Sequence, residues 1–241
     1  MERVAALTQF LQRPGPDKDA SPEEVAAHRY VRRECIRALA GVGIPAVDVS
    51  LRKSVDGVSI YPLLRVLVDP KNKNALHPPP SLTEKLEAAI GICNMKILGA
   101  DPLNLYQADV SIYLVGQFME ELIAEYRKDQ SNFATKASLK PAILWKAYAQ
   151  RLWDAKSKEN PGALDNLIQH TAKSPAGKNA VKLLEAVKSQ LEAMRIHDKV
   201  TALDSAKLKA LLPTAPERER IFNGIQDPGF IEAGKAGKAA Q

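Results

Sequence analysis

Three glutamates in one stretch of the chain are the clearest candidates for metal chemistry. Glu120, Glu121 and Glu125 fall in a segment whose apolar spacing predicts a helix, and Glu121 and Glu125 are one helical turn apart. Carboxylates at this spacing could ligate a metal ion, but a di-iron bundle also needs a Glu-x-x-His pair on another helix. The sequence supplies no such pair. We therefore interpret this cluster as a solvated helix face and predict no metal site.

The other polar residues predict no catalytic centre. No histidine has a second histidine, a cysteine or a carboxylate at the spacing of a zinc-binding helix; the four are His28, His77, His170 and His197. His28 shares a helix edge with Arg32, which we interpret as a boundary with solvent. The Gly-Lys pair at 177–178 lacks the other residues of a phosphate-binding loop. The sequence thus predicts no catalytic residue and no cofactor, although an enzyme with a dispersed site stays open.

The two cysteines, Cys35 and Cys93, both fall on apolar stripes of predicted helices. Free cysteine behaves as a small buried apolar residue, and disulfides are rare in reducing compartments. The first residues are charged at Glu2 and Arg3 and amphipathic thereafter, so they lack the basic start and uninterrupted apolar core of a signal peptide, and no run of 18 apolar residues occurs. We therefore predict a cytoplasmic protein with no membrane partner.

Charge is distributed unevenly along the chain. The formal charge of +6 divides into −1 for residues 1–135, with 16 Lys and Arg against 17 Asp and Glu, and +7 for residues 136–241, with 18 against 11. The excess includes Lys178 and Lys182, so nucleic-acid binding through the basic half is one hypothesis. Aromatic residues do not alternate with these lysines, and the simpler interpretation is a solvated helix face.

The elements that would position these residues are predicted to be helices. Ala and Leu dominate the apolar residues and aromatics are only 5%, a mixture that favours helix over sheet. Apolar periodicity, prolines and glycines predict helices over residues 2–12, 22–42, 61–68, 82–93, 103–128, 139–157, 163–172, 177–196, 204–212 and 215–224.

Residues 46–68 are the least helical segment, with a turn signal at Asp56-Gly57. Two interpretations compete there: a short β-hairpin, or an irregular segment followed by a helix at 61–68. The second is favoured.

One apolar pattern occurs twice, 51 residues apart. A predicted inward stripe in the first copy maps onto one in the second: Val31, Cys35, Ala38, Leu39 and Val42 onto Leu82, Leu86, Ala89, Ile90 and Cys93. Each copy follows a serine with a glutamate three residues later, Ser21 with Glu24 and Ser81 with Glu84, which predicts a capping box at each helix start. Lys85 and Glu87 are predicted to face solvent.

The Val31-Arg32 step followed by Cys35, Ala38 and Leu39 resembles the second helix of a HEAT-type repeat. The resemblance covers about residues 22–95 and extends to the HEAT-like modules of large bacterial repeat proteins. It implies an all-α fold of stacked helical hairpins, similar to an α-solenoid, with a curved protein-binding surface. We expect a repeat region at 1–100, a helical bundle region at 101–225 and a flexible tail at 226–241.

These observations predict a non-enzymatic scaffold or adaptor that binds a protein partner. The predicted first helix places Phe10 toward the outer edge of the repeat region. We therefore expect an exposed apolar strip there that includes Phe10, used for self-association or for docking a partner.

Overall fold

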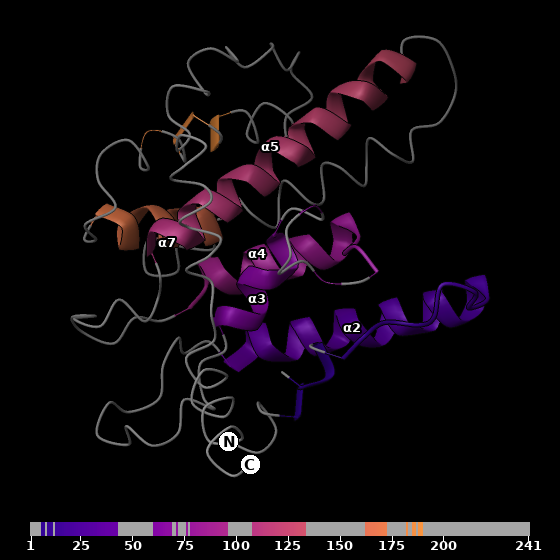
Figure 1. Cartoon of the computed structure of the whole chain (residues 1–241). Helices are drawn as coiled ribbons and strands as arrows, with labels where there is room; N and C mark the ends of the chain where they lie inside the picture. Colours follow the sequence, from indigo (N-terminus) through magenta and orange to yellow (C-terminus); the bar gives the residue numbers. More distant parts are fainter. Residues whose placement is uncertain are drawn as a thin grey trace, which may run out of the picture. The chain divides into compact units, whose positions relative to one another are not determined.

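In the computed structural model, the described parts of the chain are mostly helical (Figure 1). The structure describes residues 6–7, 9–11, 13–42, 60–68, 71, 76, 78–95, 108–133, 162–172, 182, 185–186 and 188–189. The named helices in these ranges are α2 (Pro22–Val42), α3 (Ile60–Leu67), α4 (Leu82–Cys93), α5 (Ala108–Phe133) and α7 (Ala163–Ala172). Residues 6–7 and 9–11 are also helical.

Every regular element in the described ranges is an α-helix, which confirms the prediction of an all-α protein. The predicted bounds 22–42 and 163–172 agree with α2 and α7, and the segment at 61–68 forms helix α3 rather than one strand of a hairpin. Helix α5 extends past the predicted end at 128 to Phe133, and residues 103–107 of that prediction lie outside the described residues. Residues 46–59 and the predicted helices at 139–157, 204–212 and 215–224 lie outside the described residues.

The chain divides into two compact units. The first comprises Met1–Val110 and Ala215–Gln241 and holds α2, α3 and α4; the second, Ser111–Thr214, holds α7 and nearly all of α5. No helix in the described ranges is long and apolar enough to cross a membrane.

Both predicted capping boxes are present. The Ser21 amide donates to the Glu24 carboxylate at 2.8 Å, and the Glu24 amide donates to the Ser21 hydroxyl at 3.2 Å. At the start of α4 the Ser81 amide donates to Glu84 at 2.7 Å, and the Glu84 amide donates to the Ser81 hydroxyl at 3.4 Å. Each box therefore satisfies two amides that the first turn of a helix leaves unpaired.

In the first unit, helix α4 packs against both α2 and α3. Three pairs of neighbours occur in the same order along α2 and α4: Arg32 with Glu84, Arg37 with Glu87, and Ala40 with Gly91. Because the residue numbers rise together on the two helices, α2 and α4 run parallel.

Gly91 is where α4 comes closest to its neighbours. A Cβ atom on Gly91 would lie 2.5 Å from the Ala40 Cβ and 3.1 Å from the Leu63 Cδ1. The 2.5 Å separation is too short for two carbon atoms, so a glycine is required for α4 to approach α2 this closely, whereas the Leu63 side chain would need to move only slightly. The glycine in the middle of α4 is therefore explained by packing.

The predicted inward stripe of α2 is partly wrong. Cys35 and Leu39 are buried, but Val31 is 44% exposed and Ala38 is exposed, while Arg32 and Ile36 are buried. The buried face is thus turned by about one residue, because α4 presents a carboxylate and not an apolar side chain opposite Arg32.

Helix α4 is buried around most of its circumference. Leu86, Ala89 and Cys93 are buried as predicted, but Leu82 and Ile90 are only half-buried. Lys85, predicted to face solvent, is 8% exposed. A helix with neighbours on two sides has a wider buried surface than one apolar stripe indicates.

In the second unit, helix α5 buries one apolar stripe where its side chains are described. The buried side chains include Leu114, Val115, Phe118, Met119 and Leu122. In helix α7, Leu164 and Leu167 are buried, and Asp165 forms an ion pair with Lys188.

Substitution of Gly91 with alanine tests the packing of α4. Alanine normally stabilises a helix relative to glycine by up to about 1 kcal/mol. We expect Gly91→Ala instead to lower the free energy of unfolding by roughly 1–3 kcal/mol, because the added methyl group overpacks the contact with Ala40. Urea denaturation followed by circular dichroism measures the change.

Gly41 is the matched control, since nothing lies within 4 Å of a Cβ added there. Gly41→Ala should leave the free energy of unfolding unchanged or raise it, by no more than about 1 kcal/mol. If both variants are stabilised, α4 does not pack as closely on α2 as described.

Candidate functional site

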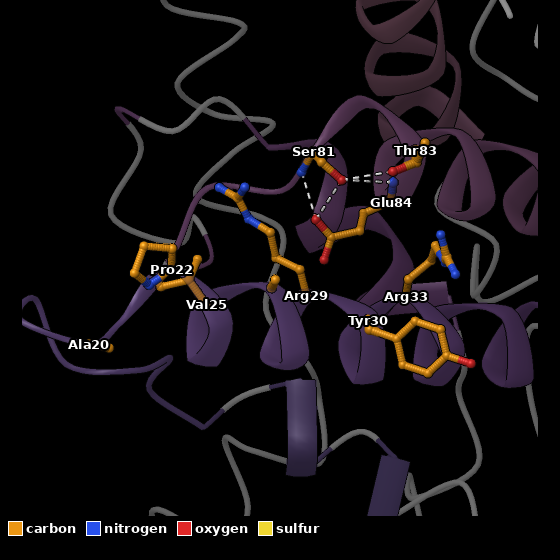
Figure 2. A pocket seen from close by; sticks show the side chains of 10 residues that line it. Ala20, Pro22, Val25, Arg29, Tyr30, Arg33, Ser81, Thr83 and Glu84 are labelled. Atoms are coloured by element: carbon orange, nitrogen blue, oxygen red, sulfur yellow. Dashed lines mark hydrogen bonds between the residues drawn. The ribbon is translucent and has the colours of Figure 1, made fainter.

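A groove of about 680 Å³ lies between the first half of α2 and the start of α4 (Figure 2). Six residues of α2 line it, namely Pro22, Val25, Ala26, Arg29, Tyr30 and Arg33. Their spacings of three, one, three, one and three residues place them on a single face of the helix. Ser81, Thr83 and Glu84 line the opposite wall.

The groove exists because α2 is longer than α4 at its N-terminal end. The two helices have 21 and 12 residues, and their contacts pair residues that are about 51 positions apart. At that offset Leu82, the first residue of α4, lies beside Val31. The first nine residues of α2, Pro22–Tyr30, therefore extend beyond the start of α4.

Glu84, which lines the groove, belongs to a buried ion pair with Arg32. Arg32 is 2% exposed and Glu84 1% exposed. The Arg32 Nε donates to the Glu84 Oε1 at 2.5 Å, and its Nη2 donates to Oε2 at 3.1 Å. The interpretation of Arg32 as a residue at the solvent boundary is therefore wrong. Its acceptors lie 46 to 52 positions away in the sequence, so local periodicity could not reveal them.

The same guanidinium also fixes the segment that leads into α4. Its Nη1 donates to the Pro78 carbonyl at 2.6 Å, and its Nη2 lies 3.5 Å from the Pro79 carbonyl. Proline has no backbone N–H to donate, so Arg32 holds this segment through hydrogen bonds to its carbonyl oxygens. Arg32 thus positions the wall of the groove that ends at Ser81.

Both carboxylate oxygens of Glu84 accept hydrogen bonds. Its Oε2 accepts from the Ser81 amide and from the Ser81 hydroxyl, the latter at 2.9 Å, as well as from Arg32. Burial alone would raise the pKa of this carboxyl, but the hydrogen bonds from Arg32 and Ser81 and the charge of Arg32 together hold the pKa below its ordinary value of 4.5. Glu84 is therefore ionised at neutral pH, and its charge is neutralised by Arg32.

The side chains available to a ligand are those of Arg29, Tyr30 and Arg33. Figure 2 shows Arg29 and Arg33 rising from α2 toward the start of α4, on either side of Glu84. Tyr30 is 60% exposed, and the Arg33 guanidinium lies 5.3 Å from the centre of its ring. A cation over an aromatic ring is attracted to it, so Arg33 and Tyr30 form one amphipathic surface.

His28 lies on α2 beside this groove, where its ring stacks on Phe10 with 5.7 Å between ring centres. Its Nδ1 is buried and finds no hydrogen-bond partner among the described residues. Burial and the nearby charge of Arg32 lower the pKa of His28, although Glu84 opposes this. Phe10 itself is half-buried, so its predicted role in an exposed apolar strip stays a prediction.

The remaining sequence candidates do not gather into a second site within the described ranges. No group of three or more His, Cys, Asp and Glu side chains that could hold a metal occurs there. Burial raises the pKa of Glu120, and Glu121 and Glu125 each have an interaction partner. Cys35 and Cys93 are free and buried, and burial raises the pKa of both thiols, which keeps them protonated.

The lysines of the basic half are only partly described. Lys182 is exposed, whereas Lys188 forms the ion pair with Asp165. Lys178 lies outside the described residues, as do His77, His197 and the Gly-Lys pair. The groove was not predicted, although the spacing of Arg29, Tyr30 and Arg33 was a signal that could have indicated it.

The two capping boxes allow a direct test of the buried ion pair. Glu84→Gln keeps an oxygen that can cap the helix but leaves Arg32 buried without its counter-ion, which should lower the free energy of unfolding by about 3–5 kcal/mol. Glu24→Gln makes the same change in an exposed box without an arginine, and should cost no more than about 0.5 kcal/mol. If urea denaturation shows the same loss in the free energy of unfolding for both variants, Glu84 and Arg32 do not form a buried ion pair.

The contribution of Glu84 should also depend on pH. Because its folded-state pKa lies below 4.5, the stabilisation is present above that pH and is lost as the pH falls through the folded-state value. The stability difference between wild type and Glu84→Gln should therefore shrink as urea denaturation is repeated from about pH 7 to about pH 3. A difference that stays constant would show that Glu84 is not held ionised by Arg32.

Comparisons with known proteins found no relative of this chain. No protein-family model, no curated protein and no solved structure matches this chain. The function must therefore be argued from the groove itself.

Proposed function

We propose that this protein is a non-enzymatic α-helical scaffold or adaptor that binds another protein through the groove of α2 and α4. The observation that carries the proposal is the cluster of Arg29, Tyr30 and Arg33 in that groove. Tyrosine and arginine are enriched among the residues that contribute most to protein–protein binding. Tyr30 is also one of two large apolar or aromatic residues in the described ranges that are prominently exposed, and the other is its neighbour Val31.

The support beneath these residues favours a rigid binding surface. Arg29 and Arg33 flank the buried Arg32–Glu84 pair, which holds α2 and α4 in one register. A surface that is already ordered loses less entropy on binding than a mobile one. The groove is therefore better suited to recognition than the same side chains on an isolated helix.

The arrangement of α2 and α4 supports the proposal of a HEAT-like repeat. The contacting pairs are 52, 50 and 51 positions apart, close to the 51-residue offset of the apolar pattern. Equivalent helices of successive repeats stack parallel in this way, and such stacks present extended surfaces to proteins. We include the cytoplasm in the proposal, because free buried cysteines fit a reducing compartment.

Photocrosslinking in the native cell tests the adaptor role. A photoreactive phenylalanine analogue at position 30 should form a covalent adduct with another protein, identified by mass spectrometry. The same analogue at position 38 is the control, because Ala38 is exposed on α2 but does not line the groove. Equal adducts from both positions, or none from position 30, would contradict the proposal, and an adduct with a second copy of this chain would replace the adaptor role by self-association.

Binding of the identified partner in purified form completes the test. Tyr30→Ala should raise the dissociation constant roughly thirtyfold, which corresponds to a loss of about 2 kcal/mol of binding free energy at the centre of an interface. Ala38→Gln should leave it unchanged. If isothermal titration calorimetry gives the same dissociation constant for Tyr30→Ala and for the wild type, the partner binds elsewhere.

A further inference from the structure

We infer that the segment bound in the groove is acidic, with Asp or Glu side chains next to an apolar one. This inference rests on the proposed function and specifies the chemistry of the partner. It follows from which charges in and around the groove are already neutralised and which are not.

Arg29 is the cation available to a ligand. It is exposed, lines the groove, and has no hydrogen bond or ion pair with any other described residue. Arg33 lies one turn further along the same face of α2 (Figure 2). Two guanidinium groups at this spacing offer paired N–H donors, which match the two oxygens of a carboxylate.

The acidic residues close to the groove do not cancel this charge. Glu84 is buried and paired with Arg32, and Glu24 keeps its charge in the capping box with Ser21 but does not line the groove. The Glu34 Oε1 lies 3.3 Å from the Arg33 Nη2 and 3.4 Å from the Arg37 Nη1. Pairs that are this exposed contribute at most about 1 kcal/mol, so Arg33 can exchange Glu34 for a ligand carboxylate at little cost.

The rest of the groove is suited to an apolar side chain. Pro22, Val25 and Ala26 line the end nearest the start of α2, and the ring of Tyr30 adds an aromatic face. A ligand residue that contacts them would lie within one or two helical turns of Arg29. The surface therefore fits an acidic segment with an apolar anchor, and not a purely ionic ligand.

A nucleic acid is a poorer match for the same two arginines. Tight binding of nucleic acid commonly neutralises about 6–10 phosphates, which needs an extended basic surface. The groove offers one exposed arginine, Arg29, and one half-buried arginine, Arg33, and residues 1–135 carry a net charge of −1. The charge and shape of the groove thus favour a short acidic segment of a protein.

Fluorescence anisotropy with synthetic peptides tests the inference on the full-length chain. The probe is a short fluorescein-labelled peptide in which Glu alternates with Leu, and its twin has Gln in place of Glu. We expect the acidic peptide to bind about tenfold or more tightly than the twin, and its affinity to fall as salt rises. Equal affinities, or no binding of the acidic peptide, would overturn the inference.

Variants of the arginines locate the binding. The double substitution Arg29→Gln with Arg33→Gln should reduce the affinity for the acidic peptide to that of the twin. Arg13→Gln removes an exposed arginine that does not line the groove and should have no effect. Circular dichroism confirms that the variants fold. An equal loss in the control, or tighter binding of a single-stranded oligothymidylate than of the peptide, would overturn the inference.

The two proposals fail separately. If crosslinking at position 30 identifies a partner whose bound segment is not acidic, the adaptor role stands and the acidic ligand is wrong. If the peptide binds as expected but position 30 yields no adduct in the cell, the groove recognises acidic segments but the adaptor role is wrong.

Discussion

The buried pair of Arg32 and Glu84 is the interaction on which the first unit depends. Both charges are removed from water, so every donor and acceptor must be satisfied within the protein. Glu84 achieves this by completing a capping box at the start of α4 while it accepts from α2. Arg32 achieves it by donating to Glu84 and to the carbonyls of Pro78 and Pro79. One pair therefore fixes where α4 starts, how the chain reaches it and how it aligns with α2.

Arg29, Arg32 and Arg33 lie on one helix, but only Arg32 is buried in an ion pair with α4, whereas Arg29 and Arg33 line the groove. In a helix with 3.6 residues per turn, positions 29 and 33 are about 40° apart around the axis, whereas position 32 is turned about 60° from the first and about 100° from the second. That rotation places Arg32 against the carboxylate of α4 and leaves Arg29 and Arg33 in the open groove. Charge alone does not separate a structural arginine from a ligand-binding one.

The sequence predicted what local patterns determine. The bounds of α2 and both capping boxes depend on residues within a turn or on a simple period. Arg32 was misplaced because its partners are distant in sequence, and Lys85 because α4 has neighbours on two sides. The groove was missed, because it depends on the register and the unequal lengths of two helices; only the spacing of Arg29, Tyr30 and Arg33 along α2 pointed to it.

That register explains why the groove lies where it does. Glycine at position 91 lets α2 and α4 approach closely at one end of their contact, whereas the long side chains of Arg32 and Glu84 span the helices toward the other end. Helix α2 extends for nine residues beyond the start of α4, so α4, its parallel neighbour among the described helices, does not cover its outer turns. In a stack of equal helices this face would be covered. Here the difference in helix length exposes Arg29 and Tyr30, and the buried ion pair beneath them keeps the surface in place.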